Sequence, residues 1–61
     1  MTALQTLRQR GPMEAAHIAG LLAMDIDDVY RELIHAEALG LARVRVTYAG
    51  RQVLAREWVA A

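Results

Sequence analysis

Residues 14–40 read EAAHIAGLLAMDIDDVYRELIHAEALG, and this stretch decides the fold. Its apolar residues recur at helical spacing, which predicts one helix over residues 14–23 and a longer one over about 25–39. The core-facing residues expected from this spacing are Ala15, Ile18, Leu21 and Leu22, then Ile26, Val29, Leu33 and Ala36. Asp25 is a favourable N-cap, and Gly40 is expected to end the second helix in the left-handed conformation. Two helices joined by a short turn form the core of a helix-turn-helix.

The residues before this stretch predict another helix, over residues 2–10. Thr2 and Gln5 have the spacing of a capping box, in which each side chain accepts a hydrogen bond from the other residue's backbone. Gly11-Pro12 then stops the helix. The chain therefore begins with three helical segments.

The residues after this stretch change to a period of two. Residues 42–48 alternate and are rich in β-branched side chains, which predicts a strand, and Ala49-Gly50 is a plausible turn. Residues 51–59 fit either a return strand or a fourth helix capped by Thr47. With the strand, the chain is an α+β protein, mainly α: a winged helix of three helices followed by a β-hairpin wing over residues 42–59.

The composition limits both the fold and the chemistry. The chain has 61 residues, no cysteine and a formal net charge of zero, so we expect one small domain over residues 1–61 with a thin core. Trp58 is expected in that core against Leu4, Leu7 or Ile18, and dimerisation would add stability. The sequence also lacks serine, so the usual Ser and Cys nucleophiles are excluded and we expect no enzymatic activity.

No cofactor, metal or membrane is expected either. The two histidines, His17 and His35, lack the spacing of a metal-ligand set. No apolar run is long enough to span a bilayer and no signal-peptide pattern is present, so we expect a cytoplasmic protein.

Three short motifs resemble one family of small winged-helix proteins. They are LRQRGPMEAAHI at residues 7–18, the positions Val29, Leu33, Glu37 and Gly40, and Arg56-Glu57-Trp58. These resemble the start, the third helix and the closing strand of FeoC-like proteins. The resemblance implies a winged helix and a strand over residues 51–59. It does not extend to the iron–sulfur cluster of that family, because this chain has no cysteine to ligate one.

The first functional hypothesis is a small bacterial or phage transcriptional regulator that binds double-stranded DNA. A winged helix places its third helix in the major groove and its wing on the backbone or in the minor groove. The candidate contacts are Arg31 and His35 on that helix and Arg43, Arg45, Arg51 and Gln52 on the wing. The DNA-binding regulator could be a homodimer. The zero net charge and the carboxylates of Asp27 and Asp28 count against this hypothesis, because phosphates require positive potential.

The alternative hypothesis is a protein-interaction adaptor that does not bind DNA. Tyr30 and Ile34 lie beside the core stripe of the third helix, where exposed apolar side chains can mark an interface. Ala16 and Gly20 belong to a small-residue face of the second helix, which would let a partner helix approach closely. The sequence leaves both hypotheses open, along with the DNA target, the partner and the oligomeric state.

Overall fold

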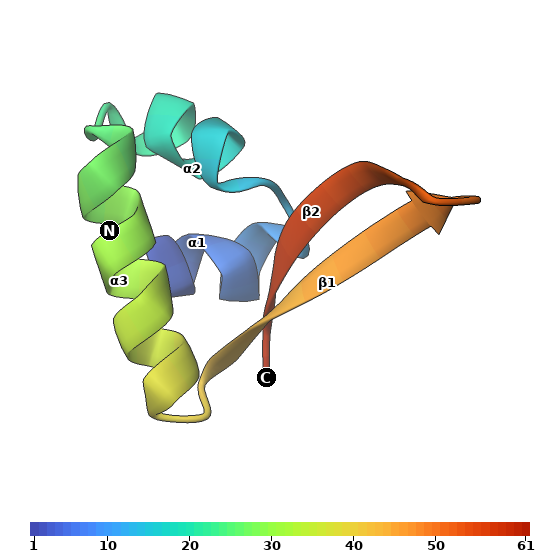
Figure 1. The fold of residues 1–61 in the computed structure, drawn as a ribbon. Helices are drawn as coiled ribbons and strands as arrows, with labels where there is room; N and C mark the ends of the chain where they lie inside the picture. Colours follow the sequence, from blue (N-terminus) through green and yellow to red (C-terminus); the bar gives the residue numbers. More distant parts are fainter.

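A computed structural model describes every residue from 1 to 61. Three helices come first in the chain, and two antiparallel strands follow. The elements are α1 (Ala3–Arg10), α2 (Ala15–Leu22), α3 (Ile26–Ala38), β1 (Ala42–Ala49) and β2 (Gln52–Ala60). The helices gather on one side, and the hairpin of β1 and β2 extends away from them (Figure 1). The predicted α+β layout of three helices followed by a hairpin is confirmed.

The start of α1 has the predicted capping box. Thr2 Oγ1 accepts a hydrogen bond from the Gln5 N–H at 3.1 Å, and Gln5 Oε1 accepts one from the Thr2 N–H at 2.9 Å. Gly11, with φ 89°, follows the last residue of the helix. A further N–H of the first turn is satisfied from α3, because Glu32 Oε1 accepts a hydrogen bond from the Ala3 N–H at 3.1 Å. This contact joins α1 to α3.

The turn between α2 and α3 is short, and Ala23 and Asp25 determine its backbone conformation. Ala23 adopts a left-handed conformation with φ 53° directly after α2. Asp25 then caps α3 as predicted, since its Oδ1 accepts a hydrogen bond from the Asp27 N–H at 2.9 Å. Gly40 has φ 75° just beyond α3, which confirms the left-handed stop.

Two of the residues that the helical spacing assigned to the core are exposed, so the prediction is wrong for them. Leu21 is 42% exposed, whereas the buried residues of α2 are Ala15, Ile18 and Ala19. Ile26 is 40% exposed. It lies at the edge of the buried stripe of α3, which is centred on the later turns, so only part of its side chain is covered.

The last segment of the chain is a strand, so the fourth-helix alternative is wrong. β2 pairs with β1 from Ala42 opposite Ala60 to Ala49 opposite Gln52. The register shifts after Thr47, which leaves Leu54 without an opposite residue as a β-bulge. Residues between Arg51 and Trp58 are good helix formers, but the eight residue pairs that join β2 to β1 outweigh that weak local preference.

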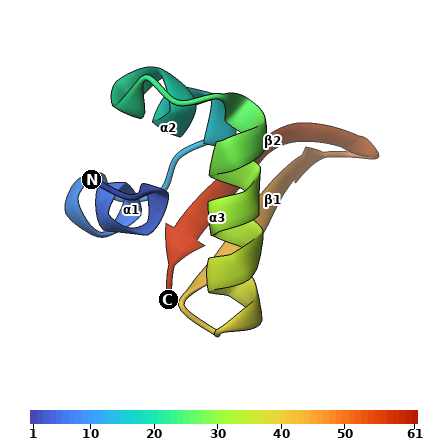
Figure 2. The same cartoon turned by 90° about the vertical axis from the view of Figure 1, so that its left-hand side faces the viewer.

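Trp58 fixes the hairpin to the helices. Its side chain is buried in one apolar cluster with Leu7 and Ile18, which confirms its predicted place in the core, whereas Leu4 is outside that cluster. The Trp58 N–H donates to the Met13 carbonyl at 2.8 Å, and the Met13 N–H donates to the Trp58 carbonyl at 3.2 Å. The segment between α1 and α2 therefore pairs with the base of β2, while the far end of the hairpin stays clear of the helices (Figure 2).

None of the three helices is both long and apolar enough to cross a membrane.

Candidate functional site

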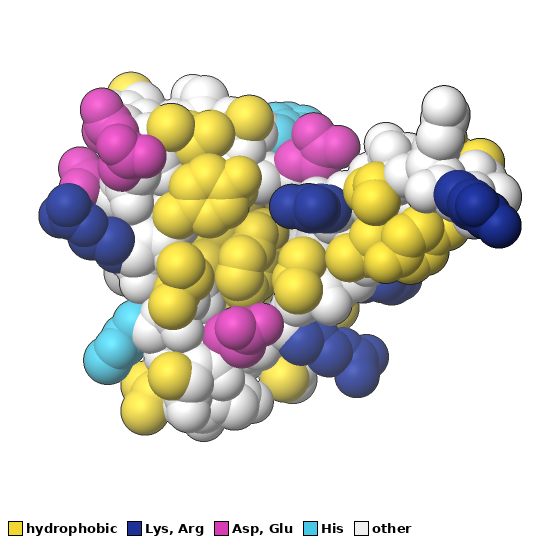
Figure 3. All heavy atoms as spheres, viewed as in Figure 1, with side chains coloured by type: hydrophobic (Ala, Val, Ile, Leu, Met, Phe, Trp, Pro, Cys, Tyr) yellow, Lys and Arg dark blue, Asp and Glu magenta, His cyan; other side chains and the backbone are white.

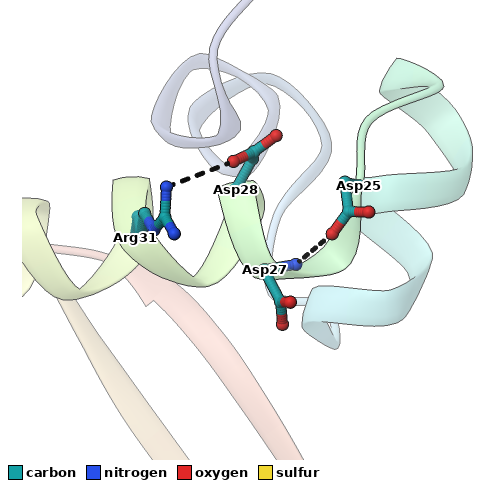
Figure 4. A network of polar contacts seen from close by, with 4 residues as sticks. All are labelled: Asp25, Asp27, Asp28 and Arg31. Carbon is teal, nitrogen blue, oxygen red and sulfur yellow. Dashed lines mark hydrogen bonds and ion pairs between the residues drawn. The ribbon is translucent and has the colours of Figure 1, made fainter.

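The exposed surface of α3 mixes cations with carboxylates. Arg31 and His35, the residues proposed to contact DNA, are both exposed. Arg31 Nη1 lies 3.7 Å from Asp28 Oδ1, while Asp25 and Asp27 occupy the turn before it (Figure 4). An ion pair with side chains 83% and 58% exposed is weak, so Arg31 stays free to move. The carboxylates nevertheless reduce the positive potential that a phosphate would meet here.

The two arginines of β1 lie on one face of the hairpin, as their alternation predicts. Arg45 Nη2 donates to Glu57 Oε1 at 3.0 Å, because the register sets these two residues directly opposite each other. Arg43, two residues earlier, makes no ion pair. The pairing of Arg45 could not be predicted from the sequence, because Glu57 becomes its partner only through the register of the two strands.

Arg51 and Gln52 lie at the tip of the hairpin. Arg51 is in the turn, Gln52 is the first residue of β2, and both are exposed. Gly50 precedes them with φ 62°, the conformation expected of it in the predicted turn. Arg51 makes no ion pair, so its charge is uncompensated at this end of the molecule.

The opposite face of the hairpin is apolar and borders a groove. The groove has a volume of about 620 Å³, and ten of the twelve residues that line it are hydrophobic. β1 contributes Val44, Val46 and Tyr48, β2 contributes Val53, Leu54, Ala55, Arg56 and Trp58, and the helical side contributes Glu14, Ala15, Ala16 and Tyr30. We call this feature the α3–hairpin groove. Arg43 and Arg45 lie on the other side of the hairpin, because side chains alternate between the two faces of a strand.

Large hydrophobic side chains of this groove remain in contact with solvent. Tyr48 and Leu54 are each 62% exposed, and Val53 is 45% exposed. Tyr30 of α3 is 43% exposed on the other side of the groove. Hydrophobic atoms gather over the middle of this face and along the hairpin, with a Lys or Arg side chain between these two areas and further charged groups around them (Figure 3). A patch of this kind marks a binding surface more often than scattered exposed residues do.

The residues of the adaptor hypothesis divide between this groove and its surroundings. Tyr30 and Ala16 line it. Ile34 lies one turn after Tyr30 on α3 and is 56% exposed, so it extends the apolar surface beyond the groove. Gly20 is exposed on α2 outside the groove, and an added Cβ there would meet no atom within 4 Å. Close packing within the chain therefore does not explain this glycine.

Sequence reasoning missed most of the groove. The alternation in β1 assigned Val44 and Val46 to one face, but did not show that this face opens towards Tyr30. The bulge at Leu54 is also absent from the pattern, and it changes which side chains of β2 reach the groove. The available signals were the alternation of valine with arginine in residues 43–46 and the positions of Tyr30 and Ala16 outside the core stripes of their helices.

The structure groups no three His, Cys, Asp or Glu side chains in a way that could hold a metal ion. Comparison with protein-family models, with curated proteins and with solved structures found no match to this chain.

Proposed function

We propose that this protein is a small, non-catalytic binding module of the winged-helix type that recognises another protein through the α3–hairpin groove. The order of three helices and a hairpin supports the winged-helix assignment. So does the resemblance of residues 7–18 to FeoC-like proteins. The groove, with ten hydrophobic residues among the twelve that line it, is the observation that carries the proposal.

The chemistry of the groove is that of a protein interface. Such interfaces combine an apolar centre, enriched in aromatic residues, with a polar rim. Here Tyr30, Tyr48 and Trp58 supply aromatic surface, while Glu14 and Arg56 supply charge. A DNA backbone against the same surface would meet mostly aliphatic side chains, which offer phosphates neither charge nor hydrogen bonds, and a single guanidinium, that of Arg56.

Photo-cross-linking from single cysteines tests the proposal. The chain has no cysteine, so a photoreactive label on Leu54→Cys or Leu39→Cys reacts at one defined place. These leucines are matched, being 62% and 60% exposed, but only Leu54 lines the groove. In extract of the source cells we expect a discrete adduct, of whatever mass, from position 54 and none from position 39. Equal labelling at both positions, or no adduct from position 54, would contradict the proposal.

Double-stranded DNA is the second candidate partner. Arg43 and Arg51 favour it, because both are exposed on the hairpin without an acidic partner, and Gln52 lies beside Arg51. Fluorescence anisotropy with a labelled duplex at ~50 and ~200 mM salt separates the candidates, since each phosphate contact makes binding more salt-dependent. The protein-binding proposal predicts no salt-dependent binding at micromolar concentration. Tight binding that Arg43→Ala and Arg51→Ala both weaken would establish the second candidate instead.

A further inference from the structure

We propose that the partner in the α3–hairpin groove is a second copy of this chain. The two copies are related by a two-fold axis, so that each hairpin lies in the groove of the other copy. This inference rests on the proposed function and names its partner. It follows from the shape, size and charge of the surface.

The same face of the molecule carries both a projection and a hollow. The hairpin extends away from the helices (Figure 1), and its outer part presents Tyr48, Val53 and Leu54. The hollow lies between these strands and Tyr30 of α3. In a two-fold dimer the same patch serves both copies, so a surface that contains an arm and the groove to receive it can be self-complementary.

The size of the molecule also favours a second copy. A stable interface buries ~800 Å² on each partner, which is about a fifth of the 4259 Å² that this chain exposes. Only 12 of 61 residues are buried in the single chain, whereas six large hydrophobics stay exposed on or beside the groove. They are Tyr30, Ile34, Val44, Tyr48, Val53 and Leu54. Covering them in a dimer would extend a core that is small for an independent domain.

The charged residues of the groove are of opposite sign and can pair between the two copies of the dimer. Each copy brings one carboxylate from the helical side, Glu14, and one guanidinium from the hairpin side, Arg56. Neither forms an ion pair within its own chain. Seating a hairpin in the opposite groove brings Arg56 of one copy towards Glu14 of the other, twice per dimer. The net charge of zero adds no repulsion between copies.

Sedimentation velocity from ~1 µM to ~1 mM measures the dissociation constant of such a dimer. We expect concentration-dependent dimers for the natural chain. Leu54→Asp should weaken dimerisation at least ~10-fold, because it sets a charge in the apolar centre, while the matched Leu39→Asp should leave it unchanged. Both positions are exposed in the single chain, so the circular dichroism of each variant should stay that of the natural chain.

Exchanging the charges of Glu14 and Arg56 tests whether these two residues pair between the copies. Glu14→Arg and Arg56→Glu should each weaken the dimer, and the double variant should regain most of the lost affinity. Sedimentation as a monomer throughout, or equal effects of Leu54→Asp and Leu39→Asp, would overturn the inference. A cross-linked adduct from position 54 with a mass other than twice that of the chain would also overturn it, yet would leave the proposed function standing.

Discussion

Trp58 joins the hairpin to the helices through both its side chain and its backbone. Its indole ring is buried with Leu7 and Ile18 in the apolar cluster, and its N–H and carbonyl pair with those of Met13. The sequence predicted the burial, because a single tryptophan in a chain this small is an expected core residue. It did not predict Met13 as the backbone partner, because no local pattern marks an isolated bridge of this kind.

Trp58→Ala should therefore destabilise the fold by ~3–5 kcal/mol, the usual cost of truncating a buried aromatic residue. For a chain with so few buried residues, this loss is expected to abolish cooperative unfolding at room temperature. Urea denaturation followed by circular dichroism measures it. Trp58→Phe is the control, which keeps most of the apolar contact and should retain a cooperative transition. A cost below ~1 kcal/mol for the alanine variant would mean that Trp58 does not hold the hairpin.

Arg45 shows how far single residues of the candidate site could be predicted. Its exposure and its face of the strand followed from the alternation in β1. Its hydrogen bond to Glu57 did not, because that contact joins residues twelve positions apart through the register of the hairpin. A charge that looked available for phosphate is thus partly compensated, and this weakens the DNA hypothesis at that position.

At the level of elements, capping and turn residues were the most predictable part of the fold. The capping box of α1, the aspartate cap of α3 and the positive φ of Gly40 and Gly50 all follow from local chemistry. The choice between strand and helix for the last segment did not follow. Its residues suit a helix locally, and the pairing with β1 that decides the outcome is a contact between distant residues.

Substitution of glycine by alanine should change the stability of the fold in opposite directions at Gly20 and Gly50. Gly20 lies within α2 with open space around its missing Cβ, so Gly20→Ala should stabilise the chain by ~0.5–1 kcal/mol. Gly50 has φ 62° in the hairpin turn, so Gly50→Ala should destabilise it by roughly 1–2 kcal/mol. The midpoints of urea denaturation test both, each variant serving as the control for the other. Destabilisation by Gly20→Ala would contradict the open space found around this position.

For the whole molecule, the sequence predicted the order of elements but not the surface that they form together. The groove depends on Tyr30 facing the apolar side of a hairpin that begins more than ten residues later, and on the bulge that turns Leu54 out of register. Neither can be derived from periodicity, because periodicity assigns faces within one element and not the packing between elements. The residues first proposed for DNA contact are spread over α3, the hairpin tip and the far face of the hairpin.

The mobility of a spin label at position 54 tests the central claim most directly, namely that the α3–hairpin groove is where this protein is bound by another. The label is attached to Leu54→Cys, with Leu39→Cys as the matched site outside the groove. Electron paramagnetic resonance spectra are recorded on dilute protein, on concentrated protein and in extract of the source cells. The account predicts a mobile label at position 54 in dilute protein that becomes immobilised on concentration, while position 39 stays mobile. A label at position 54 that remains mobile in both concentrated protein and extract would contradict it.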